Sequence, residues 1–177
     1  MSDISYRTIE IEDVSIFYQW FNDPAITANF YNSLPMNRTK VEDFVQMECV
    51  CEYPLTFIQS VQKQPIGFFQ LHDVSFIHRK VEVTLAIASE QHRGQGYGKL
   101  LLDWALHYSF YQLNLEQVYL YVYKNNLPAV RLYRSMGFTQ EGEIRVLKYH
   151  LGQPMSGYRM SLFRDEYASL KLSLQEK

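Results

Sequence analysis

Apolar and polar residues alternate along several short stretches of the chain, and this two-residue period predicts β-strands. The stretches cover residues 4–10, 55–61, 66–74, 81–88, 117–123 and 157–163, with a further strand from Phe138 onward. Residues 62–65 are polar apart from Pro65, and they predict a hairpin turn between the second and third stretches.

A period of three to four residues predicts helices over 14–21, 39–51 and 99–113. Asp13 can cap the first helix, and Asp23-Pro24 can end it. The second helix has an expected apolar side made of Val41, Phe44, Val45 and Met47. A further helix is expected from Pro128 to Met136, stopped by Gly137, and the tail from Asp165 is either a short amphipathic helix or frayed.

The order strand, glycine-rich loop, helix, strand, helix over residues 81–136 predicts a βαβα unit inside a mixed sheet, so the fold class is α/β or α+β. The chain has 177 residues, of which 47% are hydrophobic and 20% charged. This is enough to form a substantial core, and we expect a single domain over residues 1–177.

The charge and composition exclude several classes of protein. The net charge of −2 gives no electrostatic reason for a nucleic-acid partner, and no apolar run is long enough to span a membrane. The N-terminus lacks the features of a signal peptide. Cys49 and Cys51 are predicted to be free thiols in the cytoplasm, and we expect no metal site, because neither they nor His72 and His78 have a metal-binding spacing.

A glycine-rich loop lies between the strand at 81–88 and the helix at 99–113. Gly94, Gly96 and Gly98 alternate in it, so the backbone can adopt positive φ and approach a ligand closely. The following helix offers free N–H groups, and Arg93 adds a cation, which together suit a phosphate. The alternative is a tight turn without a ligand. A Walker A loop is disfavoured, because Lys99 is not followed by Ser or Thr.

Two motifs carry a family resemblance. Gln91-x-x-Gly94-x-Gly96 after a strand resembles the acetyl-coenzyme A loop of the GCN5-related N-acetyltransferases (GNAT). Asn126-x-x-Ala129-x-x-Leu132-Tyr133-x-x-x-Gly137-Phe138 is similar to the second motif of that family. Residues 6–13, 20–24 and 141–145 resemble the RimJ/RimL and spermidine-acetyltransferase branches.

The resemblance implies a mostly antiparallel mixed sheet flanked by helices, a splayed strand pair at the cofactor site, and acetyl-CoA as cosubstrate. Backbone N–H groups of the loop would hold the pyrophosphate, and backbone groups at the end of the preceding strand would pair with the pantetheine arm. The Asn126 side chain would contact that arm, and Tyr133 would lie near the thioester sulfur. The loop residues are Arg93, Gly94, Gln95, Gly96, Tyr97 and Gly98, and the strand residues are Ala86, Ile87 and Ala88.

The implied reaction is acyl transfer from a thioester to an amine, which must lose a proton to attack. We expect Tyr133 to act as the acid for the thiolate, the alternative being a core aromatic, and backbone N–H near Ile87 to stabilise the oxyanion. Glu82 is the candidate base, the alternative being an ordinary strand glutamate. His72, Asp73 or His78 could relay a proton instead.

The acceptor stays open among a small-molecule amine, an amino sugar, a polyamine and a protein N-terminus. The loop at 28–35 is rich in aromatic and amide groups, whereas polyamine enzymes of this resemblance carry paired acids near the positions of Phe30 and Tyr31. A catalytically inactive acyl-CoA-binding sensor and an interaction domain are also compatible with the sequence. A homodimer is compatible with the 15% aromatic content.

Overall fold

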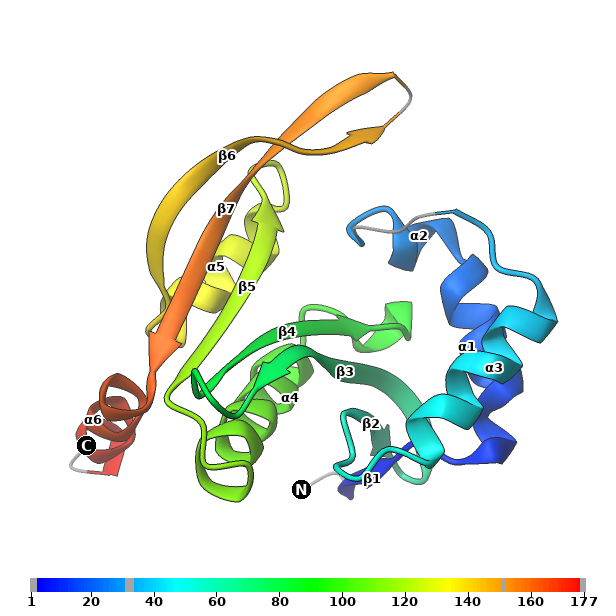
Figure 1. Cartoon of the computed structure of the whole chain (residues 1–177), viewed down its shortest axis with the longest axis horizontal. Helices are drawn as coiled ribbons and strands as arrows, with labels where there is room; N and C mark the ends of the chain where they lie inside the picture. Colours follow the sequence, from blue (N-terminus) through cyan, green and yellow to red (C-terminus); the bar gives the residue numbers. More distant parts are fainter. Residues whose placement is uncertain (1–2, 31–33, 151, 176–177) are drawn as a thin grey trace. The chain divides into compact units, whose positions relative to one another are not determined.

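The computed structural model describes residues 3–30, 34–150 and 152–175. Seven strands form one sheet in the order β1-β2-β3-β4-β5-β7-β6 (Figure 1). β4 and β5 pair in parallel, while β1–β2, β2–β3, β5–β7 and β6–β7 pair antiparallel, so the predicted mixed, mostly antiparallel sheet is confirmed. The strands are β1 (Ile4–Thr8), β2 (Thr56–Val61), β3 (Gln64–Ser75), β4 (Lys80–Ile87), β5 (Gln117–Tyr123), β6 (Thr139–His150) and β7 (Gln153–Phe163).

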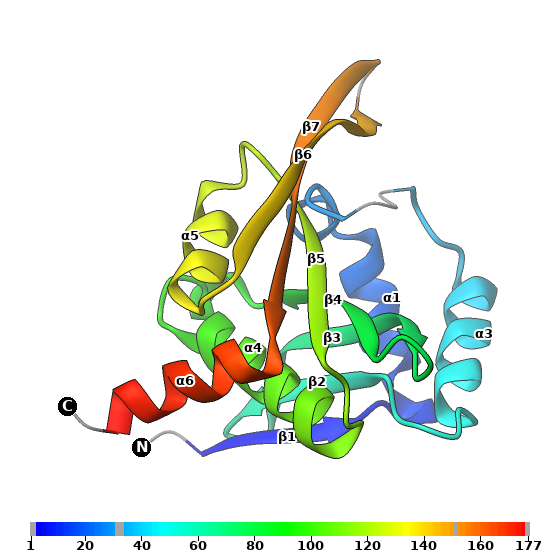
Figure 2. The same ribbon diagram turned by 60° about the vertical axis from the view of Figure 1, so that its left-hand side comes forward.

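The helices agree with the sequence pattern in place, with differences at their ends. They are α1 (Val14–Asn22), α2 (Pro24–Thr27), α3 (Arg38–Cys49), α4 (Tyr97–His107), α5 (Leu127–Ser135) and α6 (Arg164–Gln175), with two 3₁₀ helices, η1 (Ile11–Asp13) and η2 (Glu90–His92), and a π-helix directly after α4, η3 (Tyr108–Gln112). The tail is helical, as α6 in Figure 2 shows. The sequence pattern missed α2, whose first turn is capped by the Asp23 side chain.

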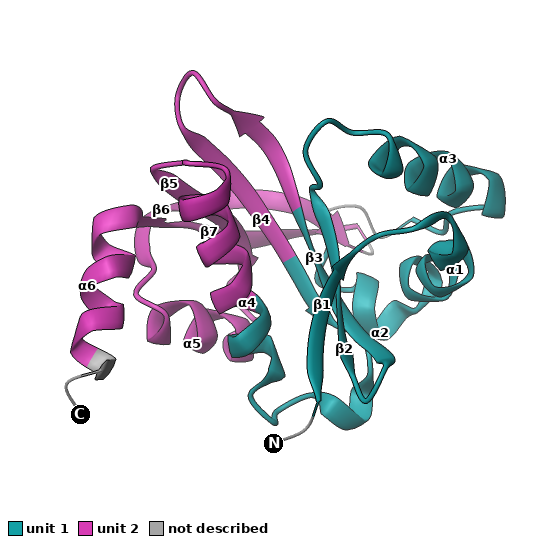
Figure 3. Ribbon diagram, turned by 90° about the horizontal axis from the view of Figure 1, so that it is seen from below, with its two compact units in different colours: residues 1–70, 85–101 teal, residues 71–84, 102–177 magenta. Residues whose placement is uncertain are grey.

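The chain divides into two compact units, which Figure 3 colours separately. Unit 1 contains Met1–Gln70 and Leu85–Leu101, and unit 2 contains Leu71–Thr84 and Leu102–Lys177. The single domain stays a prediction.

The core of unit 1 surrounds Phe17 of α1, which is fully buried. Its ring centroid lies 5.3 Å from those of Phe21 and Phe68, and Trp20 stacks on Phe68 at 5.3 Å. From α3, Val41 and Val45 belong to the same buried cluster, and Phe44 packs against it. Met47 is 68% exposed, so its predicted place on the apolar side is wrong.

The sequence predicted that the Asp13 side chain caps α1, but in the structure it makes no such capping hydrogen bond. Its carboxylate instead accepts two hydrogen bonds from the Arg7 guanidinium, at 2.6 and 2.7 Å, and one from the Glu10 backbone N–H at 2.8 Å. Asp13 is 2% exposed, and a buried carboxylate needs such partners. The residue therefore joins β1 to the turn before α1.

The sheet in unit 2 has an apolar and a polar face. Val118, Leu120 and Val122 of β5 are buried, as are Met160 and Leu162 of β7.

The register between β4 and β5 covers only three pairs, from Lys80–Gln117 to Glu82–Tyr119, although both strands continue beyond it. This early end of the pairing fits the splayed strand pair that the resemblance implied.

Candidate active site

The glycine-rich loop of unit 1 contains two glycines in the left-handed region. Gly94 has φ +74° and Gly96 has φ +90°. Gly98 lies inside α4, which begins at Tyr97, so the predicted extension of the loop to Gly98 is wrong, while the predicted contact of its backbone with the pyrophosphate stays a prediction. The Gly96 carbonyl accepts hydrogen bonds from Lys99 and Leu100 at 3.0 and 3.3 Å, and this starts the helix.

The space beside these two glycines is open. A Cβ built on Gly94 or Gly96 would meet no protein atom within 4 Å. Crowding by neighbouring side chains therefore does not explain why glycine stands at these positions. The positive φ angles explain it, because glycine adopts them without strain, and a ligand that approaches the backbone would favour glycine as well. The first N–H groups of α4 have no partners within the helix, and they suit an anion such as the pyrophosphate.

Arg93 links the loop to the end of β4. Its Nε donates to the Ile87 carbonyl at 2.9 Å, and its Nη2 donates to the Ala88 carbonyl at 3.2 Å. The sequence predicted a cation turned toward phosphate, whereas in this structure the guanidinium holds the backbone that was predicted to bind the pantetheine arm. Its position fixes the loop against the strand that precedes it.

The sequence reasoning missed two residues that support this loop. Gly67 of β3 approaches β4 so closely that an added Cβ would lie 2.4 Å from the Ala86 carbonyl oxygen. Gln59 of β2 is fully buried, and its Nε2 donates to the Tyr97 carbonyl at 3.4 Å and to the Tyr6 hydroxyl at 3.2 Å. Gln59 gave no distinct signal in the sequence, because Thr56 and Ser60 make the same strand half polar.

His92 lies within the loop region and contacts its neighbours. Its Nδ1 is 2.7 Å from the Ser89 Oγ, and its ring meets the Tyr97 ring edge-on at 5.4 Å. The Gln95 amide donates to the Gln91 carbonyl. These contacts hold the turn between β4 and α4, and they give His92 a structural role.

Glu82 of unit 2 is half-buried and pairs across the strands with Tyr119. Burial raises the pKa of Glu82, the charge of Asp73 raises it further, and the charge of Arg159 lowers it. A carboxyl with a raised pKa holds a proton more readily, which suits a general base. Arg159 and Tyr119 were missed by the sequence reasoning, because their neighbours come from distant strands.

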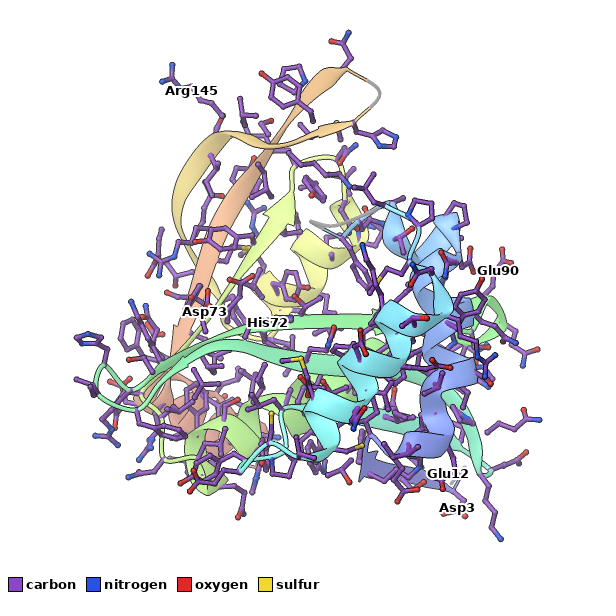
Figure 4. The ribbon with its side chains drawn as sticks, turned by 45° about the vertical axis from the view of Figure 1, so that its right-hand side comes forward. Asp3, Glu12, His72, Asp73, Glu90 and Arg145 are labelled. Carbon is purple, nitrogen blue, oxygen red and sulfur yellow. The ribbon has the colours of Figure 1, made fainter. Side chains whose placement is uncertain are left out.

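The candidate relay groups belong to β3 and to the hairpin that follows it. Figure 4 labels His72 and Asp73, which are adjacent on β3. Asp73 has φ +48°, which is unusual for a residue other than glycine inside a strand. Burial lowers the pKa of His72, although the Asp73 charge opposes this. The His78 backbone N–H donates to Ser75 Oγ at 3.1 Å at the hairpin.

The second motif lies in unit 2. Tyr133 of α5 is 7% exposed, and its ring lies 5.7 Å from that of Phe138. Burial raises the pKa of Tyr133 to about 12, so the phenol keeps its proton at neutral pH. The Asn126 Oδ1 accepts a hydrogen bond from the Ala129 N–H at 3.3 Å and so caps α5. The amide nitrogen of Asn126 is then the group available for the predicted contact with the pantetheine arm.

Two further observations limit the kinds of site. Within residues 3–30, 34–150 and 152–175, no cluster of three or more His, Cys, Asp or Glu side chains is suited to a metal ion. None of the helices in the same ranges has the length and apolar character to cross a membrane. Cys49 and Cys51 are free thiols, as the sequence predicted.

The glycine-rich turn of unit 1 and, in unit 2, a half-buried carboxyl with a raised pKa and a buried phenol are groups of the kind that acyl transfer from a coenzyme A thioester uses. The family model described as "Acetyltransferase (GNAT) domain" matches residues 4–139. The chain belongs to the GNAT acetyltransferase family. It is an acyltransferase that moves an acetyl group from acetyl-CoA to a primary amine, as the sequence motifs indicated.

The chain is also similar to individual proteins over most of its length. It is 29% identical to the spermidine N(1)-acetyltransferase of Vibrio cholerae over 167 residues, which cover 94% of this chain and 96% of that protein. The crystal structure of spermidine N-acetyltransferase from V. cholerae with CoA and spermine has a TM-score of 0.87 and 27% identity, covering 93% of this chain and 98% of that one. A dodecameric structure of the V. cholerae enzyme has a TM-score of 0.77 and 26% identity, covering 93% and 95%.

Proposed function

We propose that this enzyme acetylates a primary amine of a polyamine, with acetyl-CoA as the donor. The observation that carries the proposal is a pair of carboxyl groups in unit 2, Asp73 and Glu82, close enough that the charge of Asp73 raises the pKa of Glu82. Two negative charges attract a substrate that carries several ammonium groups. The similarity to spermidine acetyltransferases over 94% of the chain supports the same substrate class.

The loop at 28–35 contributes less to this proposal. The resemblance places paired acids near residues 30 and 31 in polyamine enzymes. Here Phe30 packs against the core, with its ring 5.9 Å from that of Phe68. Residues 31–33 lie outside the described residues. We therefore assign recognition of the ammonium groups to Asp73 and Glu82.

In the proposed reaction, the amine gives up a proton to Glu82, directly or through water, and its nitrogen attacks the thioester carbonyl. The C–N bond forms and the C–S bond breaks. Backbone N–H near Ile87 stabilises the oxyanion, and Tyr133 donates a proton to the departing thiolate. The second proton of the nitrogen leaves as the amide forms and returns to the Tyr133 phenolate, directly or through water, so that only the proton on Glu82 is released to solvent. The proposed donor-binding groups are the backbone of 86–88 and 93–98 and the Asn126 amide.

A thiol-release assay with a panel of amines tests the substrate. Spermidine and spermine are expected to give the highest kcat/KM, against amino sugars, amino acids and peptides. D73N is expected to raise KM for polyamines more than it lowers kcat. E42Q is the matched control, because it removes an exposed carboxylate on α3 whose described ion pair is with Arg38. Turnover of peptides or amino sugars with none of polyamines would contradict the proposal.

We propose further that the enzyme is a homo-oligomer and works in the cytoplasm. The dodecameric V. cholerae neighbour supports the first point, and the two free cysteines support a reducing compartment. Light scattering on the purified chain tests the oligomer: a mass of 21.0 kDa would contradict it.

A further inference from the structure

A polar face of the sheet in unit 2 surrounds the proposed base. β4 pairs with β5 at Glu82 and Tyr119, and β5 pairs with β7 at Tyr119 and Ser161. Residues that pair directly across strands project to the same side of a sheet, as do residues two apart along one strand. Glu82, Tyr119, Ser161 and Arg159 therefore share one face.

The guanidinium of Arg159 is held in place on this face. Its Cζ lies 4.7 Å from the centroid of the Tyr119 ring, and its Nη1 lies 3.1 Å from Glu141 Oε2. The other oxygen of Glu141 accepts from Gln117 Nε2 at 3.0 Å and from Ser161 Oγ at 2.8 Å. Within the part of the chain that the structure describes, the buried Nε of Arg159 has no hydrogen-bond partner. The cation is thus fixed, and one of its N–H groups is not used.

This inference rests on the proposed function, in which Glu82 accepts the proton of the amine. We propose that Arg159 is a positioning residue for that base: its guanidinium, fixed by Tyr119 and Glu141, keeps the Glu82 carboxyl ionised until the amine arrives. A half-buried carboxyl favours its neutral form, and a neutral carboxyl cannot accept a proton. A neighbouring cation opposes this tendency without touching the substrate.

The other groups around Glu82 do not supply such a cation. From β3, the Asp73 charge raises the pKa of Glu82, and His72 beside it has a pKa lowered by burial, which favours neutral imidazole. From β5, Tyr119 has a raised pKa and stays neutral. From β6, Glu141 is paired with Arg159. Among the groups that shift the pKa of Glu82 in the described residues, Arg159 is the one that lowers it.

Infrared difference spectroscopy of the carboxyl band tests this role directly, with E82Q used to assign the band of Glu82. R159Q removes the cation and keeps a planar amide. We expect Glu82 to become protonated at a higher pH in R159Q than in the wild-type chain. R159K keeps the positive charge and is expected to restore the titration toward the wild type.

E141Q gives a second test with the opposite sign. It removes the anion that offsets Arg159, so Glu82 is expected to titrate at a lower pH than in the wild type. E141Q keeps Arg159 itself and an amide oxygen that can accept its hydrogen bond, so it tests the proposal even where R159Q does not fold. An unchanged titration of Glu82 in folded R159Q or in E141Q overturns the proposal.

Activity separates this inference from the proposed function. With a correct base assignment, R159Q moves the acid limb of kcat to higher pH, and R159Q has no added effect in the E82Q background. Wild-type rates in E82Q would remove Glu82 as the base, while the infrared titration would still report what Arg159 does to it. Loss of activity in E82Q together with an unshifted titration would retain the base and reject Arg159.

Discussion

Gly67 provides a sharp test of how the fold supports cofactor binding. G67A adds one methyl group to β3 at the point where β4 passes closest. The added Cβ would lie 2.4 Å from the Ala86 carbonyl oxygen, and 3.1 Å from both Cα and Cδ1 of Ile87. Ordinary contact begins near 3.4 Å, so the overlap with the Ala86 oxygen is 1.0 Å (3.4 − 2.4). That atom belongs to the backbone, which cannot turn away as a side chain can.

Overpacking of a core costs about 1–3 kcal/mol, and a backbone neighbour places G67A at the upper end of that range. For a chain of this size, about 3 kcal/mol lowers Tm by roughly 6–12 °C. We also expect KM for acetyl-CoA to rise more than KM for the amine, because the displaced residues Ala86 and Ile87 belong to the backbone proposed to bind the donor. Thermal melts and thiol-release kinetics measure the two effects.

G142A is the matched control. Gly142 lies in β6 without a positive φ, and a Cβ there would meet nothing within 4 Å. Replacing this glycine changes the unfolded chain in the same way, without the collision. If G67A melts within a degree or two of G142A, the close approach of β3 to β4 does not limit the free energy of unfolding, and the prediction is wrong.

Three further predictions concern the site itself. E82Q is expected to melt at a higher temperature than the wild type at pH 7–8, since a raised pKa means that the ionised Glu82 opposes folding. The difference vanishes below about pH 3, well under the ordinary glutamate pKa, where the carboxyl is neutral in both states, and an equal gap at both pH values would contradict this. Y133F is expected to lower kcat by roughly 100-fold with little change in KM, and because the pKa of Tyr133 is about 12, wild-type kcat should not fall between pH 8 and 10; a full-rate variant removes this acid from the mechanism. G96D places a charged side chain where φ is +90° and is expected to abolish acetyl-CoA binding in calorimetry, whereas G142D on open β6 is expected to keep it.

The sequence pattern located the strands and helices because their periods are local properties. The alternation over Gln117–Tyr123 matches β5 at both ends, and the strand–loop–helix order placed the glycine-rich loop. The error at Met47 has a geometric cause. It lies six residues after Val41, which turns the helix by about 600°, so Met47 points about 120° away from the row that Val41, Phe44 and Val45 form.

The errors at Asp13 and Gly98 come from contacts and helix starts that local patterns do not encode. Asp13 has the right residue type and place for a helix cap, but in the structure its carboxylate is paired with the Arg7 side chain of β1 instead. Gly98 continues the alternation of the loop glycines, yet α4 already begins at Tyr97. The supporting roles of Gly67 and Gln59 depend on how closely strands and helix approach, which no spacing in one sequence gives.

The two proposed proton-transfer groups are buried for opposite uses. Burial favours the neutral form of any acid, and in both Glu82 and Tyr133 it raises the pKa. For Tyr133 the neutral phenol is the form needed before the reaction, so burial alone prepares it to donate. For Glu82 the neutral form is the one reached after it has accepted a proton. Burial therefore makes Glu82 a stronger base toward the amine, but it also favours protonation of Glu82 before the amine binds. A base in this position needs a cation to hold it ionised, and an acid in the position of Tyr133 does not; the proposal gives that role to Arg159, which shares a face of the sheet with Glu82.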